Sequence, residues 1–273
     1  MQTPEFLAHR SIVSVTGADA EAFLNSIVTV STSGMTPGDI RYGALLTPQG
    51  KVIADMLLTR AGDAILIDCA ASAAPALVKR LTMMKLRAAV AIEERSDLGI
   101  WVFEGDADPR SALAPRRKIG PSGETSDASA YHAARVAAGL PEQGFDFGAE
   151  DVFPADIDMD LVGGIDFKKG CFVGQEVVSR MKRRGTARRR TLKCTVAEGV
   201  AAPAPILANG FEIGMLTSIS GGAGLARVRI DRLAEALARN ETLTAGDAAI
   251  TFDTPSWLAD ELAAMAKAKE AKA

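Results

Sequence analysis

The sequence predicts an α+β fold followed by a smaller all-β unit, and two observations support this prediction. In the N-terminal two thirds, strand-like and helix-like segments are mixed in an order that does not suit a doubly wound parallel sheet. From Thr191 to about Phe252, short β-like runs are separated by Gly and Pro, which is typical of a small barrel or sandwich. The length of 273 residues is enough for two domains.

The elements of the first part are predicted from local patterns. Asp19 precedes an apolar-periodic run and can cap a helix over 20–27. Thr47–Gly50 has Pro at its second and Gly at its fourth position, as a type I turn prefers. Residues 104–129 are rich in Gly, Pro, Asp and Ser, and we expect a loop region there. The other predicted elements are strands at 10–15, 42–46, 52–59, 64–68, 89–93 and 99–103, and helices at 74–86 and 129–138.

These patterns divide the chain into three parts. Residues 1–190 form the α+β module, and residues 191–255 form the β-barrel, which a helix interrupts at 232–239. Residues 256–273 are alanine-rich and charged, and we expect a C-terminal helical tail.

The composition is that of an ordinary globular protein, with 48% hydrophobic residues, 24% charged residues and a net charge of −3. This balance gives no general attraction to nucleic acid or to an anionic membrane. The N-terminus has no cationic stretch followed by an apolar core, and no apolar run reaches the ~18 residues that a membrane span needs. We therefore expect a cytoplasmic protein that does not enter a membrane.

The cysteines and histidines are few and widely spaced. An odd number of cysteines (Cys69, Cys171 and Cys194) argues against a disulfide framework and indicates a reducing compartment. The cysteines lack CxxC spacing, and His9 and His132 are the only histidines. A zinc or iron–sulfur site built by one chain is therefore not expected.

The segment from Ile165 to Gly185 carries the strongest chemical pattern. Gly170 and Gly174 bracket Cys171 and allow a tight turn, after which a helix is predicted to run from about Gly174 to Arg183. The helix start and the nearby lysines favour the thiolate, so Cys171 could be reactive. A small buried cysteine in a glycine turn explains the pattern equally well. Cys69 and Cys194 lie in apolar strands and are interpreted as core residues.

The string Lys169-Gly170-Cys171-Phe172-Val173-Gly174-Gln175-Glu176 resembles the signature of the YgfZ family. Further segments resemble landmarks of the same family, at residues 16–19, 23–24, 47–51, 135–141 and 153–156, the last with one residue missing. The resemblance covers about residues 6–255. The same region also resembles the related glycine-cleavage T protein, an aminomethyltransferase whose version of the motif lacks the cysteine.

The resemblance implies a T-protein-like fold, in which two interleaved ferredoxin-like sub-domains and a C-terminal β-barrel form a ring around a central channel. It implies tetrahydrofolate, or a one-carbon derivative, as the cofactor. It also implies a role in iron–sulfur cluster assembly or repair, with assembly proteins or client enzymes as partners. Cys171 would be the key residue, and Lys169, Gly170, Phe172, Gly174, Gln175 and Glu176 would shape its loop.

One departure from the T proteins favours an accessory protein over an enzyme. T proteins carry a catalytic Asp after a strand that corresponds here to the stretch around Asp68, but no acid follows Asp68 until Glu93. Without that acid, aminomethyl transfer loses its proton-transfer partner. A folate-dependent one-carbon transferase stays the alternative, and a basic adaptor for nucleic acid is a third hypothesis.

Three residues outside the motif are candidate folate contacts. Tyr131 and Arg135 are four residues apart on one predicted helix, so they share a face. Tyr131 could stack on a folate ring and Arg135 could pair with a carboxylate, whereas the alternative is core packing for Tyr131 and a surface cation at Arg135. Arg10, at the start of the first strand before the turn that would border the channel, is the third candidate.

Residues 180–190 hold seven cations in eleven positions. A solvated helix end and linker explain this run, but it could also bind an acidic folate tail, an acidic protein or RNA. No aromatic residue interleaves with the cations, so the sequence argues against nucleic acid.

Overall fold

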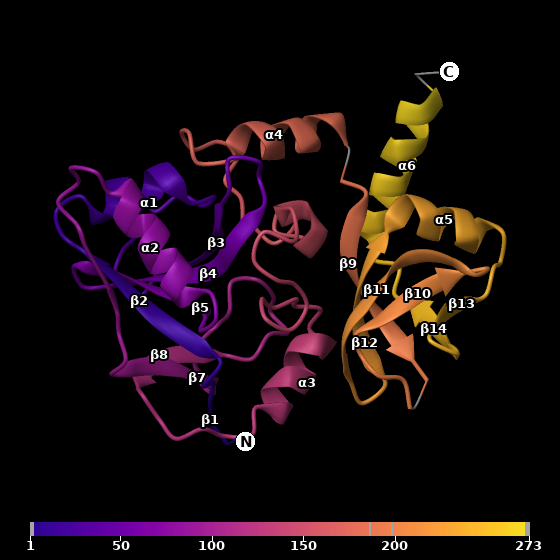
Figure 1. Cartoon of the computed structure of the whole chain (residues 1–273), viewed down its shortest axis with the longest axis horizontal. Coiled ribbons are helices and arrows are strands. Elements are labelled where there is room, and N and C mark those ends of the chain that lie inside the picture. The colour runs from indigo at the N-terminus through magenta and orange to yellow at the C-terminus, as the bar shows by residue number, and fades with distance from the viewer. Residues whose placement is uncertain (1–2, 186, 198, 271–273) are drawn as a thin grey trace.

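A computed structural model describes residues 3–185, 187–197 and 199–270 of the chain. The α/β part and the barrel lie side by side, and helix α4 bridges them at one end (Figure 1). The α/β part contains an antiparallel five-stranded sheet in the order β3-β4-β5-β2-β6. Its strands are β2 (Arg10–Thr16), β3 (Ile40–Leu46), β4 (Val52–Ala61), β5 (Ala64–Ala70) and β6 (Ala91–Glu94).

Alternation along β4 shows why this sheet is buried on both faces. Met56 and Leu58 point into a cluster covered by α1 (Ala20–Ile27) and α2 (Ala74–Met84). Leu57 points to the other face and packs in a second cluster with Phe147, Phe172 and their neighbours. The segment that carries the cysteine motif is therefore built onto the sheet face opposite the two helices.

A second, three-stranded sheet has the order β1-β7-β8 and packs against α3. Its elements are β1 (Glu5–Phe6), β7 (Leu98–Asp106), β8 (Arg117–Pro121) and α3 (Ser129–Ala137). Strand β8 lies where the sequence predicted a loop region, so that prediction was wrong over these five residues. The strand escaped notice because the inward side chain at its start is the buried cation Arg117, which breaks the apolar alternation.

The C-terminal part is a closed barrel in the order β10-β11-β12-β9-β14-β13. This outcome confirms the predicted barrel, and α5 (Ile230–Ala238) is the predicted interruption. A short 3₁₀ helix, η1 (Pro154–Ile157), precedes α4 (Gln175–Arg184) in the connecting region. The remaining elements are β9 (Arg189–Val196), β10 (Ala204–Ala208), β11 (Phe211–Ser220), β12 (Ala223–Arg229), β13 (Leu243–Ala245), β14 (Ala248–Phe252) and α6 (Ser256–Glu270).

The helix cap that the sequence predicts at Asp19 is not formed by the side chain of this residue. Asp19 precedes α1, but its side chain makes no hydrogen bond within that helix. Its carboxylate instead accepts a 2.7 Å hydrogen bond from the N–H of Ala89, which ties the helix start to the loop before β6.

Across the described ranges, no helix is long and apolar enough to cross a membrane.

Candidate functional site

The loop before α4 is held by a lysine and an aspartate. Asp166 accepts hydrogen bonds from the N–H groups of Lys168 and Lys169 at 2.8 and 3.1 Å. The ammonium of Lys169 donates to the carbonyl oxygens of Val28 and Val30 at 2.6 and 2.9 Å. Burial lowers the pKa of Lys169 to about 8, and the nearby charge of Asp166 offsets only part of that effect. Lys169 therefore anchors the loop to the chain after α1.

A close approach between two glycines fixes the start of α4. Gly174 has φ +79°, and a Cβ at this position would lie 2.7 Å from the carbonyl oxygen of Thr47 and 3.1 Å from the Cα of Gly50. Phe172, two residues earlier, is buried against the five-stranded sheet. The Thr47–Gly50 turn and the cysteine motif thus pack directly against each other, and a larger residue at position 174 would clash with this turn.

The sequence left two interpretations of Cys171 open, and the structure excludes the buried one, while the reactivity of the thiol stays a prediction. Cys171 is exposed, whereas Cys69 and Cys194 are buried. Burial raises the pKa of both buried thiols to about 12, so neither is a ready nucleophile. The interpretation of Cys171 as a small buried residue is therefore wrong.

Two details of the predicted motif also need correction. Gly170 does not have a positive φ, and a Cβ added there would meet no atom within 4 Å, so only Gly174 requires glycine. The ammonium of Lys169 is directed to backbone carbonyls and is therefore used by the loop itself. Gln175 is half-buried and Glu176 is exposed, both in the first turn of α4.

A buried network of ion pairs lies where the two sheets, α3 and the barrel meet. Arg10 pairs with Asp68 at 2.7 Å and with Glu142 at 3.0 Å. Arg117 pairs with the same Asp68 at 2.8 Å. Burial alone would raise the pKa of Glu142, but its hydrogen bond with His9 and the charge of Arg10 outweigh burial and lower that pKa. Each carboxylate of the network therefore lies against at least one arginine.

The structure brings the three predicted folate contacts into this one region. Arg135 is fully buried and pairs with Asp146 at 2.7 Å, so the interpretation as a surface cation is wrong. Arg10 is committed to Asp68 and Glu142. Tyr131 is 3% exposed and, with His9 and Phe145, lines a cavity of about 520 Å³. Direct folate contact by these three residues stays a prediction.

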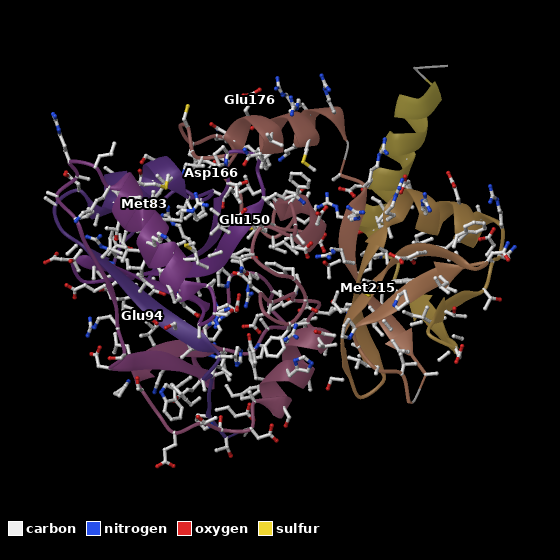
Figure 2. The ribbon with its side chains drawn as sticks, in the orientation of Figure 1. Met83, Glu94, Glu150, Asp166, Glu176 and Met215 are labelled. Atoms are coloured by element: carbon white, nitrogen blue, oxygen red, sulfur yellow. The ribbon has the colours of Figure 1, made fainter. Side chains whose placement is uncertain are left out.

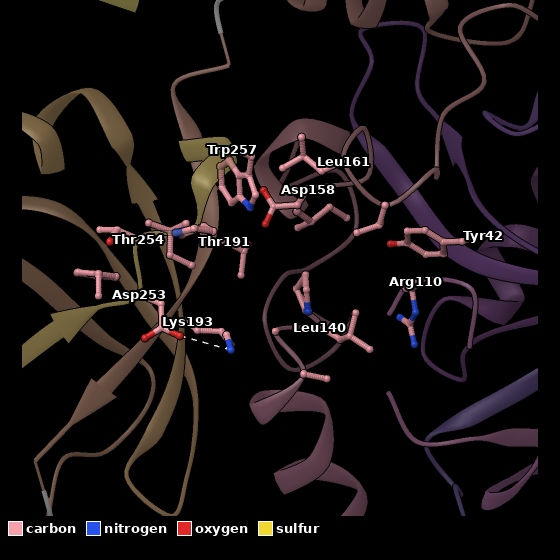
Figure 3. A pocket seen from close by; sticks show the side chains of 18 residues that line it. Tyr42, Arg110, Leu140, Asp158, Leu161, Thr191, Lys193, Asp253, Thr254 and Trp257 are labelled. Carbon is pink, nitrogen blue, oxygen red and sulfur yellow. Dashed lines mark ion pairs between the residues drawn. The ribbon is translucent and has the colours of Figure 1, made fainter. Parts of the chain in front are cut away.

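A second cavity, of about 580 Å³, lies between the barrel and the rest of the chain (Figure 3). We call it the interdomain cavity. Trp257 and Asp158 approach it from the α6 and η1 sides, while Tyr42 and Arg110 lie across from them (Figure 3). Lys193, ion-paired with Asp253 at 3.4 Å, reaches it from β9. Its size is in the range of cavities that bind drug-sized molecules.

Asp158 is the most unusual charged group of the interdomain cavity. Burial raises the pKa of its carboxyl well above the usual range, although Arg190 opposes this effect from 3.7 Å. Its Oδ1 atom is buried and has no hydrogen-bond partner among the described residues. An unpaired buried acceptor at a cavity wall is costly unless a ligand or water satisfies it.

Sequence reasoning missed the residues of the interdomain cavity. The cavity is lined by side chains from five segments that are far apart in the sequence, so no local spacing links them. These side chains are Tyr42, Arg110, Asp158, Lys193 and Trp257. One feature of the sequence could have pointed to the cavity. The chain has only two Trp and two Tyr, so each of these residues is a stronger candidate for a binding site than in an average protein.

Comparisons with known proteins extend this description. Residues 7–100 match the model of the GCVT N-terminal domain, and residues 188–260 match the CAF17 C-terminal beta-barrel domain. The crystal structure of glycine cleavage system aminomethyltransferase T from Bartonella henselae superposes with a TM-score of 0.73 at 17% identity, covering 92% of this chain and 84% of that one. The chain therefore has the T-protein fold. This result confirms the fold class predicted from the sequence.

The similar curated proteins are named iron–sulfur cluster assembly factors. The IBA57 homologue of Pyricularia oryzae is 30% identical over 72% of this chain and 58% of its own length. Mouse IBA57 is 28% identical over 86% of this chain and 76% of its own length, and human IBA57 is 26% identical over 80% and 74%. The chain thus spans 58% to 76% of the length of these three relatives. All three are named mitochondrial, and the expected cytoplasmic location, like the YgfZ resemblance, stays a prediction.

We predict that a single thiol reacts rapidly in the native protein. A small neutral disulfide such as 2,2′-dithiodipyridine should label Cys171 alone, because burial keeps Cys69 and Cys194 protonated and out of reach. Spectrophotometric titration should give one fast equivalent, and three after denaturation. Cys171→Ser should remove the fast equivalent, and a persisting fast phase in that variant would contradict the assignment.

Gly174→Ala and Gly170→Ala form a matched pair that tests the packing of the turn against the cysteine motif. Gly174→Ala should lower the free energy of unfolding by about 1–3 kcal/mol, because it adds both a positive-φ penalty and a clash with Thr47. Gly170→Ala should change it by less than about 0.5 kcal/mol, since the new methyl meets no atom. Urea unfolding measures both values, and equal effects would show that the glycine contact does not fix the loop.

Proposed function

We propose that the protein binds tetrahydrofolate, or a one-carbon derivative of it, and assists iron–sulfur cluster assembly or repair in client enzymes. The observation that carries this proposal is the pairing of an exposed, rigidly held Cys171 with a folate-sized cavity on a T-protein fold. The assembly role is also supported by the relatives, whose names describe iron–sulfur cluster assembly factors.

The interdomain cavity offers the three kinds of contact that a folate needs. The pterin ring presents adjacent N–H donors, which a carboxylate such as Asp158 can accept. Trp257 and Tyr42 provide flat surfaces against which a ring can stack. Lys193 and Arg110 provide cations for the glutamate carboxylates. We therefore propose this cavity as the folate site, in place of the region of Tyr131, Arg135 and Arg10 that the sequence predicted.

Cys171 suits a transient role toward a cluster. Within the described residues, no group of three or more His, Cys, Asp or Glu side chains is arranged to hold a metal ion. A single thiolate can supply one ligand, and the remaining ligands of an iron–sulfur cluster would come from a partner. Cys171 therefore acts on a cluster that another protein carries, as a ligand or as a redox partner.

The fold also supports a second candidate, a folate-dependent aminomethyl transferase, because the superposed structure has that name. After β5 the chain passes through Ala70–Ala74 into α2, so no carboxylate follows the strand where a T protein has its catalytic Asp. This arrangement favours the accessory role. Sustained product formation from an aminomethyl donor and tetrahydrofolate would reverse that preference.

Asp158→Asn tests the folate assignment. The variant should bind tetrahydrofolate about 10- to 100-fold more weakly, because it replaces a charged acceptor of two hydrogen bonds. Since burial raises the pKa of Asp158, wild-type affinity should increase as the pH rises through that pKa and decrease below it. Calorimetric titration at several pH values measures both effects, and Asp63→Asn, at an exposed position outside the cavity lining, is the control. Unchanged affinity and pH dependence in Asp158→Asn would rule out this site.

Cys171→Ser tests the assembly role. In a host that lacks its own copy, this variant should fail to restore the activity of cluster-dependent enzymes, because serine keeps the size but removes the soft sulfur ligand. Cys69→Ala removes a thiol that never reaches solvent and should restore activity, at a stability cost of about 1 kcal/mol. Full rescue by Cys171→Ser would reject the role of the sulfur.

A further inference from the structure

Helix α4 and the loop before it carry five exposed cations, one in the loop three residues before the exposed thiol and four in the second half of the helix. We call this cluster, made of Lys168, Arg180, Lys182, Arg183 and Arg184, the cationic face. All five side chains are exposed. Figure 2 shows nitrogen-tipped side chains that project from α4 away from the sheet beneath it. Val178 is the buried residue of this helix, so Arg180, Arg183 and Arg184 lie on the side opposite the core.

The cationic face is not neutralised by the folded chain. No carboxylate of the described residues forms an ion pair with any of its five cations. Lys182 lies 3.7 Å from the ring centroid of Phe167, and Arg183 contacts the carbonyl of Ser179 at 3.4 Å. Arg180 repels Arg183 and Arg184, which are three and four residues further along the helix. This repulsion is notable on a chain whose net charge is −3.

A groove continues the same positive surface toward the motif loop. It has a volume of about 420 Å³, and Arg41, Lys168 and Lys182 line it together with Asp166. Asp166 already accepts hydrogen bonds from the N–H groups of Lys168 and Lys169. Arg41 donates to the carbonyl oxygens of Ser31 and Ser33, so none of the three groove cations is ion-paired with a carboxylate of the described residues. The groove is wide enough to receive acidic side chains from a partner.

We propose that the cationic face docks an acidic surface of the partner protein that exchanges an iron–sulfur cluster at Cys171. This inference rests on the proposed function and adds to it the chemistry by which the partner is recognised. Charge complementarity identifies the occupant, because only a negatively charged surface relieves the repulsion within the face. Lys168 is three residues from the exposed Cys171, so a partner that covers the loop end of the cationic face also reaches the thiol.

Two other classes of occupant fit the face less well. Binding of a single-stranded nucleic acid commonly uses exposed aromatic rings for stacking, but Phe172 is buried and Phe167 is covered by Lys182. A membrane surface would need large apolar side chains on the exposed side of the helix, and the exposed large hydrophobic residues lie elsewhere in the chain. An acidic protein surface requires neither feature.

Disulfide exchange at Cys171 tests the proposal with defined probes. Three ten-residue peptides, rich in Glu, Gln or Lys, would each carry a terminal cysteine as a mixed disulfide with thionitrobenzoate. The Cys171 thiolate attacks the peptide sulfur, the peptide becomes disulfide-bonded to Cys171, and thionitrobenzoate leaves as a coloured thiolate. At low salt the Glu-rich peptide should react at least about tenfold faster than the Gln-rich peptide, with the Lys-rich peptide slowest. The three rates should converge in high salt.

Charge-reversal variants show whether the cationic face is responsible. The double variant Arg180→Glu with Arg183→Glu should bring the rate of the Glu-rich peptide to within about twofold of the rate of the Gln-rich peptide. The control double variant is Lys79→Glu with Arg87→Glu, which changes the net charge by the same amount at exposed positions of the α2 region. This control should preserve most of the difference between the two rates. Equal loss in both double variants would overturn the proposal. A faster reaction with a thiol-bearing RNA decamer than with the Glu-rich peptide, or co-sedimentation with phosphatidylserine vesicles that the first variant abolishes, would also overturn it.

The outcomes separate this proposal from the function on which it rests. Should the Glu-rich peptide gain no advantage while Cys171→Ser still fails to rescue client enzymes, the docking surface is refuted and the assembly role stands. Should the peptide dock while Cys171→Ser rescues fully, the assembly role of the sulfur is refuted. Reaction with the small neutral disulfide should be the same in both double variants, which shows that the thiol itself is intact.

Discussion

The arrangement of the whole chain depends on pairing buried arginines with buried carboxylates. Arg10 on β2, Arg117 on β8 and Arg135 on α3 converge on Asp68, Glu142 and Asp146, and Arg135 also donates to Ser218 of the barrel. Removing one member of such a network leaves an uncompensated charge, which costs about 3–5 kcal/mol. The network therefore sets the relative position of both sheets, α3 and the barrel, and with it the walls of the two cavities.

The same network explains why parts of the fold were accessible to sequence reasoning and others were not. Helices α1 and α2 and most strands follow the apolar periodicity, since their buried faces are hydrophobic. Strand β8 was missed because its buried side chain, Arg117, is charged. The partner of Asp19 was missed because Ala89, which donates to its carboxylate, is 70 residues away. Long-range polar contacts leave no periodic trace in a sequence.

The candidate site likewise has a part that the sequence predicted, the cysteine motif, and a part that it did not, the interdomain cavity. The cysteine motif is a continuous string, so the turn at Gly174 and the helix that follows it were predicted. Gly170 does not need to be glycine, and the exposure of Cys171 was not decidable from a glycine turn. The interdomain cavity is discontinuous, and Asp158 and Trp257 meet there only because Arg190 binds Asp160 and Glu261 at once and so draws α6 against the η1 segment. Neither partner of Arg190 can be identified from sequence spacing.

The contact between Gly50 and Gly174 has a consequence for the sulfur at the loop tip. Two backbones meet there without intervening side chains, and Lys169 and Phe172 hold the other side of the same loop. A tether of this kind leaves little freedom to swing, and Cys171 is not part of the wall of the interdomain cavity. A folate bound in the interdomain cavity and a cluster held at Cys171 would therefore occupy separate places on the same chain, each with its own access to solvent or to a partner.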